Sequence, residues 1–149
     1  LVVLDSILNR ITQNRAKGRN TFIFIDEIYL LFQHEYSANF LFTLWKRVRK
    51  YGAYATGITQ NVDDLLQSHT ARTMLANSEF LIMLNQASTD RIELAKLLNI
   101  SDLQLSYITN VDAGHGLIKV GSSLVPFANK FPKNTKLYKL MTTKPGEGA

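Results

Sequence analysis

The sequence contains no cysteine and no long apolar run. Without cysteine, its 149 residues provide no disulfide, no thiolate nucleophile and no cysteine-ligated zinc site. No apolar stretch approaches the roughly 18 to 20 residues that a membrane-spanning helix needs. An apolar content of 46% and a charged content of 19% exclude general disorder. We therefore expect one globular domain, and the missing cysteine fits a cytoplasmic location.

Acidic residues are missing from the C-terminal part of the chain. Residues 115–144 contain six lysines and no aspartate or glutamate, whereas the whole chain carries a net charge of +5. This stretch therefore accounts for more than the entire positive excess. It is either an ordinary solvated surface or a face that contacts nucleic acid, protein or membrane phosphates.

Several signals of other protein classes are also absent. The three histidines, His34, His69 and His115, do not have the spacing of a zinc site, and no Gly-x-Ser-x-Gly motif indicates a serine nucleophile. The first four residues contain no initiating methionine, and no basic leader or cleavage site of a signal peptide. We therefore expect the sequence to be cut from a longer chain.

Apolar spacing predicts an alternation of helices and strands. Helices are expected at residues 3–16, 36–50, 62–67, 72–77, 88–98 and 101–108, the last two capped by residues 88–90 and by Ser101. Strands are expected at residues 21–25, 53–59 and 79–84, and a hairpin at residues 115–119 and 124–129. The alternation through residue 84 predicts an α/β fold, with a mainly parallel sheet flanked by helices and a C-terminal antiparallel hairpin. The continuous apolar run at residues 21–25 predicts a strand buried on both faces.

Two adjacent carboxylates follow the first predicted strand. Asp26 and Glu27 come directly after residues 21–25, at the carboxyl end of a strand, where ligands of open α/β sheets bind. In P-loop nucleotide hydrolases an aspartate in this position helps to hold Mg²⁺ on the nucleotide phosphates. A glutamate beside it is placed to orient the attacking water. The alternative is that the two acids only cap the following turn.

Gln60 and a cluster of cations add context to this strand end. Gln60 follows the second predicted strand, where such ATPases place a sensor of the γ-phosphate, although a lone glutamine there is usually an ordinary loop residue. The helix between the two strands ends in a group of cations, Lys46, Arg47, Arg49 and Lys50. These cations either balance the helix macrodipole or supply an arginine finger to a neighbouring subunit's nucleotide.

The order and spacing of these motifs resemble the conjugation ATPases of type IV secretion systems. The matching segments are residues 21–31 with Asp26-Glu27, residues 44–52 with the cations, and residues 56–65 with Thr59-Gln60. Residues 75–84 and 112–121 resemble later strands of the same family. The likeness therefore covers nearly the whole chain.

The resemblance implies a partial RecA-like P-loop NTPase domain. Residues 1–144 are expected to form the C-terminal half of that domain and residues 145–149 a loose tail. The full-length parent is expected to hydrolyse ATP with Mg²⁺, as a hexamer at the cytoplasmic face of the cell membrane, which it touches only peripherally. Secretion-channel and coupling proteins are its expected partners, with DNA as an additional candidate.

The resemblance also assigns roles to individual residues. Asp26, Glu27 and Gln60 are expected to be catalytic, and Asp26 is expected to hold Mg²⁺ through water. The candidates for an arginine finger or for phosphate contacts are Arg47, Arg49 and Lys50. Which of these three cations contacts phosphate stays open.

One motif of the family is missing. The phosphate-binding loop Gly-x4-Gly-Lys-Ser/Thr, whose backbone amides and lysine bind the phosphates, occurs nowhere in these residues. Residues 114–122 superficially resemble it, but Lys119 lies within an apolar alternation and no helix follows, so this segment is predicted to be a hairpin. In the family the loop precedes the Asp-Glu strand. We therefore expect the 149-residue fragment alone to be inactive as an ATPase.

Two alternatives remain open. A DNA-translocating ATPase of the FtsK-like or HerA-like branches shares the Asp-Glu and Gln arrangement. A non-catalytic module would instead bind nucleic acid through the basic C-terminal segment, with Asp26 and Glu27 purely structural. Stimulation of ATP turnover by DNA marks the first alternative, and DNA binding with a steep salt dependence marks the second.

Overall fold

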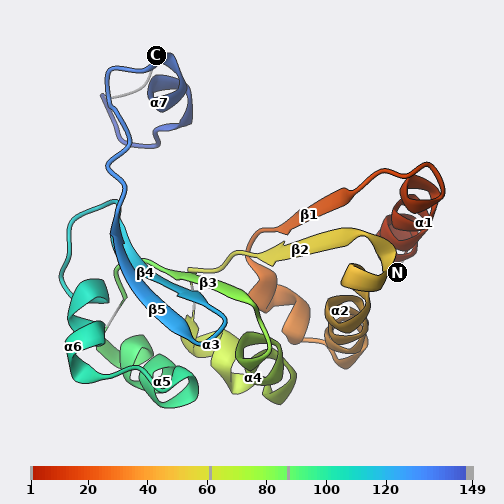
Figure 1. Ribbon diagram of the computed structural model, residues 1–149, viewed down its shortest axis with the longest axis horizontal. Helices are drawn as coiled ribbons and strands as arrows, with labels where there is room; N and C mark the ends of the chain where they lie inside the picture. The colour runs from red at the N-terminus through yellow and green to blue at the C-terminus, as the bar shows by residue number, and fades with distance from the viewer. Residues whose placement is uncertain (1, 61, 87, 147–149) are drawn as a thin grey trace. The chain divides into compact units, whose positions relative to one another are not determined.

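The chain forms two compact units in the computed structural model (Figure 1). The structure describes residues 2–60, 62–86 and 88–146, apart from the side chains of residues 2, 4 and 88–90. Unit one comprises Leu1–Ser78 and unit two comprises Glu79–Ala149. Each unit has its own sheet and its own helices. The expected division into a domain of residues 1–144 and a tail of residues 145–149 stays a prediction.

Unit one is built around a two-stranded parallel sheet. Its elements are α1 (Val2–Ala16), β1 (Thr21–Ile25), η1 (Ile28–Phe32), α2 (Glu35–Arg47), η2 (Val48–Tyr51), β2 (Ala53–Gly57), α3 (Val62–Gln67) and α4 (His69–Ala76). β1 and β2 pair in parallel from Thr21↔Ala53 to Ile25↔Gly57. The predicted helices, the two strands and their parallel pairing are confirmed, although β2 ends two residues earlier than expected.

The amphipathic helix α2 contributes to two core clusters of unit one. Its Leu41 and Leu44 are 0% and 3% exposed. Leu41 packs in a cluster with four other buried residues: Ile28, Leu65, Ala71 and Met74. Leu44 packs in a second cluster with Ile11 of α1, Val48 and Ala53. Apolar residues at three- and four-residue steps, which predicted this helix, therefore form the centre of the unit.

The face of the β1–β2 sheet that carries Phe22, Phe24 and Tyr54 is exposed, and we call it the bare face. Phe22, Phe24 and Tyr54 are 64%, 69% and 54% exposed, and the rings of Phe22 and Tyr54 stack with centroids 5.0 Å apart. The prediction that residues 21–25 are buried on both faces is therefore wrong for this chain. Strand side chains alternate between faces, and the helices of unit one cover only the face that carries Ile23, which packs against the second cluster.

Unit two contains a three-stranded antiparallel sheet in the order β3-β4-β5. Its elements are β3 (Phe80–Met83), α5 (Ser88–Leu98), α6 (Asp102–Leu105), η3 (Ser106–Ile108), β4 (His115–Val120), β5 (Ser123–Ala128) and α7 (Lys136–Met141). The predicted hairpin is confirmed, with a two-residue turn between Val120 and Ser123 in which Gly121 has a φ of 56°. Lys119 lies within β4, so residues 114–122 are not a phosphate-binding loop.

The third predicted strand pairs differently from the expectation. Residues 79–84 were expected to extend the parallel sheet, but β3 pairs antiparallel with β4, from Phe80↔Val120 to Met83↔Leu117. Helix–strand alternation identifies the strand itself, but the direction of its neighbour depends on contacts with residues more than 30 positions later. The α/β fold class is confirmed, and the C-terminal hairpin gains a third strand.

Two side-chain caps mark helix starts in unit two. Ser101 accepts a hydrogen bond from the backbone N–H of Gln104, whose side chain accepts from the backbone N–H of Ser101, so the predicted cap is confirmed. Thr135 caps α7 in the same way by accepting from the N–H of Tyr138. α7 was not predicted, because its six residues are too few to show a clear apolar period. The expected cap at residues 88–90 lies outside the described side chains.

Candidate active site

Backbone hydrogen bonds tie the carboxyl ends of β1 and β2 together beyond the strands themselves. The N–H of Ile58 donates to the carbonyl oxygen of Ile25 at 2.8 Å, and the N–H of Ile28 donates to the carbonyl oxygen of Ile58 at 3.0 Å. Asp26 and Glu27 lie between Ile25 and Ile28. The two carboxylates are therefore held at the same sheet edge as the segment that follows β2.

Glu27 has a left-handed backbone conformation, with φ 49° and ψ 46°. Its N–H donates to Oδ1 of Asp26 at 3.0 Å, and its carbonyl oxygen accepts from the N–H of Leu30 at 3.0 Å. A residue with a Cβ in this region costs about 1 to 3 kcal/mol, and such residues cluster at functional sites. The turn is also oriented so that Asp26 is exposed and Glu27 is half-buried.

Gly57 allows this turn to pack closely on β2. A Cβ at residue 57 would lie 2.6 Å from Cδ1 of Ile28 and 3.5 Å from the ring of Trp45. Ile28 is 5% exposed and belongs to the first core cluster, so it has little room to move away. Packing in the core therefore holds Ile28, the residue directly after Glu27, in place, and this restricts the position of the turn.

Gln60 lies at the same edge of the sheet. It is exposed and comes two residues after Ile58, whose hydrogen bonds to Ile25 and Ile28 hold the chain beside the Asp26-Glu27 turn. The structure therefore brings Asp26, Glu27 and Gln60 to one edge, as their positions after parallel strands predicted. Carboxylate oxygens that project from such an edge are hard ligands of the kind that suits Mg²⁺.

The three candidate cations lie at the other edge. Arg47 ends α2, Arg49 and Lys50 lie in η2, and all three are exposed. The N–H of Thr21 donates to the carbonyl oxygen of Gly52 at 3.1 Å, which fixes the end of η2 at the amino ends of the strands. Five strand residues span roughly 15 Å. The cations are therefore remote from the carboxylates of their own chain.

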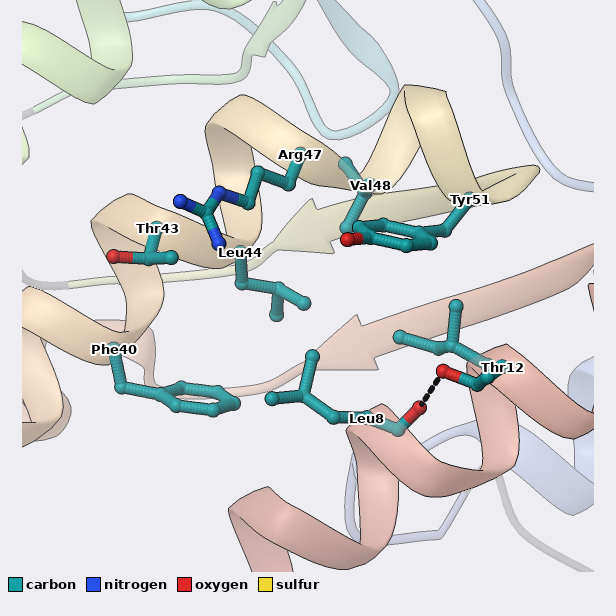
Figure 2. A pocket seen from close by; sticks show the side chains of 9 residues that line it. Leu8, Thr12, Phe40, Thr43, Leu44, Arg47, Val48 and Tyr51 are labelled. Carbon is teal, nitrogen blue, oxygen red and sulfur yellow. Dashed lines mark hydrogen bonds between the residues drawn. The ribbon is translucent and has the colours of Figure 1, made fainter.

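Arg47 also borders an apolar hollow between α1 and α2, which Figure 2 shows from close by. The hollow has a volume of about 200 Å³, and apolar side chains dominate its lining: Leu8, Ile11, Phe40, Leu44, Val48 and Tyr51, with Thr12 and Thr43 beside them. It lies away from the strand ends that carry Asp26 and Gln60, so it is not the predicted phosphate site.

No preformed metal cluster accompanies the carboxylates. Within residues 2–60, 62–86 and 88–146, no group of three or more histidine, aspartate or glutamate side chains is arranged to hold a metal ion. Two adjacent carboxylates suit a Mg²⁺ ion that also takes oxygen ligands from phosphates and water. The sequence predicted that the two carboxylates follow a parallel strand, whereas the left-handed Glu27 and the packing of Ile28 against Gly57 gave no recognisable signal in it.

Comparisons with known proteins support the family resemblance. The sequence model of the TraG P-loop domain matches residues 1–119. The structure of VirB4 of Thermoanaerobacter pseudethanolicus is similar to this chain with a TM-score of 0.77 and 26% sequence identity over 87% of the chain. The match covers 36% of the VirB4 chain, so the present chain spans about a third of its length. No curated protein matches.

Proposed function

Because the chain belongs to the TraG P-loop domain family, we propose that it is the later half of the ATP-hydrolysing motor domain of a conjugation or type IV secretion ATPase. The observation that carries the proposal is the edge at which Asp26, Glu27 and Gln60 meet, on paired parallel strands. The likeness to VirB4 supports the same reading. In the parent we propose a hexamer at the cytoplasmic face of the membrane, acting with secretion-channel and coupling proteins.

Each residue at this edge has a proposed role. Asp26, which is exposed, holds Mg²⁺ through water on the phosphates of ATP. Glu27 orients the attacking water, and its left-handed backbone, fixed by Asp26 and Leu30, sets the direction of its side chain. Gln60 senses the γ-phosphate from the neighbouring strand. When bound, Mg²⁺ neutralises charge on the phosphates, and these side chains supply the positioning.

The remote cations fit a role in a neighbouring subunit. Arg47, Arg49 and Lys50 lie near the amino ends of strands that span roughly 15 Å, whereas the proposed phosphate site lies at their carboxyl ends. Among the described residues, none of the ion pairs involves these three cations. We therefore propose that one of them acts as an arginine finger on the ATP of the adjacent subunit.

We propose that the phosphate-binding loop comes from another part of the parent. The chain contains no Gly-x4-Gly-Lys-Ser/Thr motif. Among the described residues of unit one, β2 pairs only with β1, and one face of the sheet is bare although parallel sheets are normally covered on both faces. Both features fit a sheet that the preceding part of a longer protein completes.

Substitutions on the bare face test whether the rest of the parent covers it. Phe24→Thr is expected to change the free energy of unfolding of the isolated chain by less than about 0.5 kcal/mol, because Phe24 is exposed there. In the longer parent, where the face is covered, the same change is expected to cost about 2 kcal/mol. Chemical denaturation of both proteins measures the difference.

The neighbouring residue Ile23 is the matched control. Ile23 packs on the covered face in the isolated chain, so Ile23→Thr should destabilise both proteins by similar amounts. Equal and small effects of Phe24→Thr in both proteins would show that the parent leaves this face bare.

The proposal as a whole is tested by Mg²⁺-dependent ATP turnover of the longer parent, with and without DNA. Turnover that DNA leaves unchanged is expected of a secretion ATPase. Strong stimulation by single-stranded or double-stranded DNA would favour an FtsK-like or HerA-like translocating pump. A parent that hydrolyses no ATP would overturn the proposal and favour the non-catalytic module.

A further inference from the structure

The segment around α7 exposes a group of apolar side chains. Phe131, Leu137, Leu140 and Met141 are 49%, 56%, 64% and 72% exposed. Together with Tyr138 and Thr142, three of them (Phe131, Leu137 and Met141) line an open hollow of about 350 Å³. The helix itself is well defined locally, since Thr135 caps its start. We call this group of four apolar residues the C-terminal patch.

Lysines surround the C-terminal patch. Lys136 and Lys139 lie within α7, and Lys130, Lys133 and Lys144 flank it. Nζ of Lys130 lies 3.7 Å from a carboxylate oxygen of Asp112, and Nζ of Lys133 lies 6.0 Å from the centre of the Tyr138 ring. No acidic residue occurs between residues 115 and 144. The patch therefore combines exposed apolar side chains with one sign of charge.

We propose that the C-terminal patch docks on the surface of an anionic membrane. Exposed Leu, Met and Phe side chains beside lysines are the composition of a helix that lies in the interface, with its apolar side chains below the headgroups and its cations on the lipid phosphates. No helix among the described residues is long and apolar enough to cross a bilayer. The inference does not depend on the ATP half-site.

Two other occupants fit the patch less well. Single-stranded nucleic acid needs free aromatic faces, but Phe131 and Tyr138 stack on each other with centroids 6.4 Å apart and Lys133 lies over Tyr138. Nucleic acid would also leave Leu140 and Met141 exposed. A second copy of the same patch would place lysines against lysines, which opposes association.

Co-sedimentation with vesicles tests the docking. The 149-residue chain is expected to bind vesicles of an equal mixture of phosphatidylcholine and phosphatidylglycerol and not vesicles of phosphatidylcholine alone. A lysine near an anionic surface strengthens binding about fivefold, so Lys136→Gln with Lys139→Gln should weaken it roughly 25-fold. Leu140→Gln with Met141→Gln should weaken it at least tenfold, because the inserted apolar area is lost.

A matched control separates the patch from total charge. Lys17→Gln with Arg19→Gln removes the same charge from exposed positions of unit one and should leave vesicle binding unchanged. Circular dichroism confirms that each variant is folded.

Three results would overturn the proposal. The first is no binding of the folded chain to the mixed vesicles. The second is full vesicle binding by the Leu140→Gln, Met141→Gln variant, or a loss of binding in the Lys17→Gln, Arg19→Gln control as large as that in the Lys136→Gln, Lys139→Gln variant. The third is a chain that binds single-stranded DNA but no vesicles. In that case the lysine substitutions abolish DNA binding and the Leu140→Gln, Met141→Gln variant retains it.

Discussion

Replacing Glu27 by glutamine in the longer parent is expected to lower ATP turnover by about 100-fold to 10,000-fold, the usual contribution of a positioned acid–base group. Glutamine keeps the size of the side chain but cannot accept a proton from the attacking water. The substitution should leave the left-handed backbone at residue 27 and the contacts of Ile28 with the core unchanged. Steady-state phosphate release measures the effect.

Nucleotide binding should survive the Glu27→Gln change. Because the proposed role of Glu27 is to orient the water and not to bind the nucleotide, the affinity for Mg²⁺-ATP should stay within a few-fold of the wild-type value. Glu35, an exposed residue in the first turn of α2, supplies a control: Glu35→Gln should hydrolyse ATP normally. Normal turnover of the Glu27→Gln parent would remove Glu27 from the mechanism.

Loss of the proposed arginine finger is expected to lower ATP turnover by as much as the Glu27→Gln change or more. Arg47→Ala, Arg49→Ala and Lys50→Ala are made singly in the parent, and one of them should lower turnover by about 1,000-fold or more. The physical reason is the loss of a positive charge beside the phosphoryl group at the moment its negative charge develops. Lys46→Ala is the control, because Lys46 lies over the ring of Phe42 at 3.9 Å.

Mixing two inactive variants tests whether that cation acts between subunits. The cation variant retains Glu27, and the Glu27→Gln variant retains the cation. In mixed oligomers some interfaces therefore combine an intact Glu27 with an intact cation, and turnover should recover in part. Mixed oligomers that form but stay inactive would place the cation's effect within its own subunit.

The candidate site illustrates what local sequence can predict. Asp26 and Glu27 follow an apolar run and Gln60 follows the next one, so parallel pairing alone brings them to one edge. The same topology places the cations, which precede β2, at the opposite ends of the strands. This separation follows from the order of the elements, but the spacing of the residues alone does not reveal it. The left-handed Glu27 could not be predicted, because glutamate has no preference for that conformation. The turn depends on the hydrogen bonds of Glu27 with Asp26 and Leu30 and on the close packing of Ile28 against Gly57.

The fold was predictable where neighbouring residues determine it. The hairpin, the Ser101 cap and the apolar period of α2 depend on contacts within a few positions along the chain. The partner of β3 and the bare face of Phe22 and Phe24 depend on what lies beside each strand in space. An apolar run indicates that the side chains on both faces of a strand can be buried. It does not indicate whether the residues that cover each face belong to the same fragment.

The most direct test compares ATP turnover by the isolated 149-residue chain with turnover by the longer parent that carries a phosphate-binding loop. If this chain is half of an ATP site, the parent hydrolyses ATP with Mg²⁺ and loses that activity with Asp26→Asn. The isolated chain then shows no turnover above that of its own Asp26→Asn variant. Appreciable turnover by the isolated chain that depends on Asp26 and Glu27 would contradict the account.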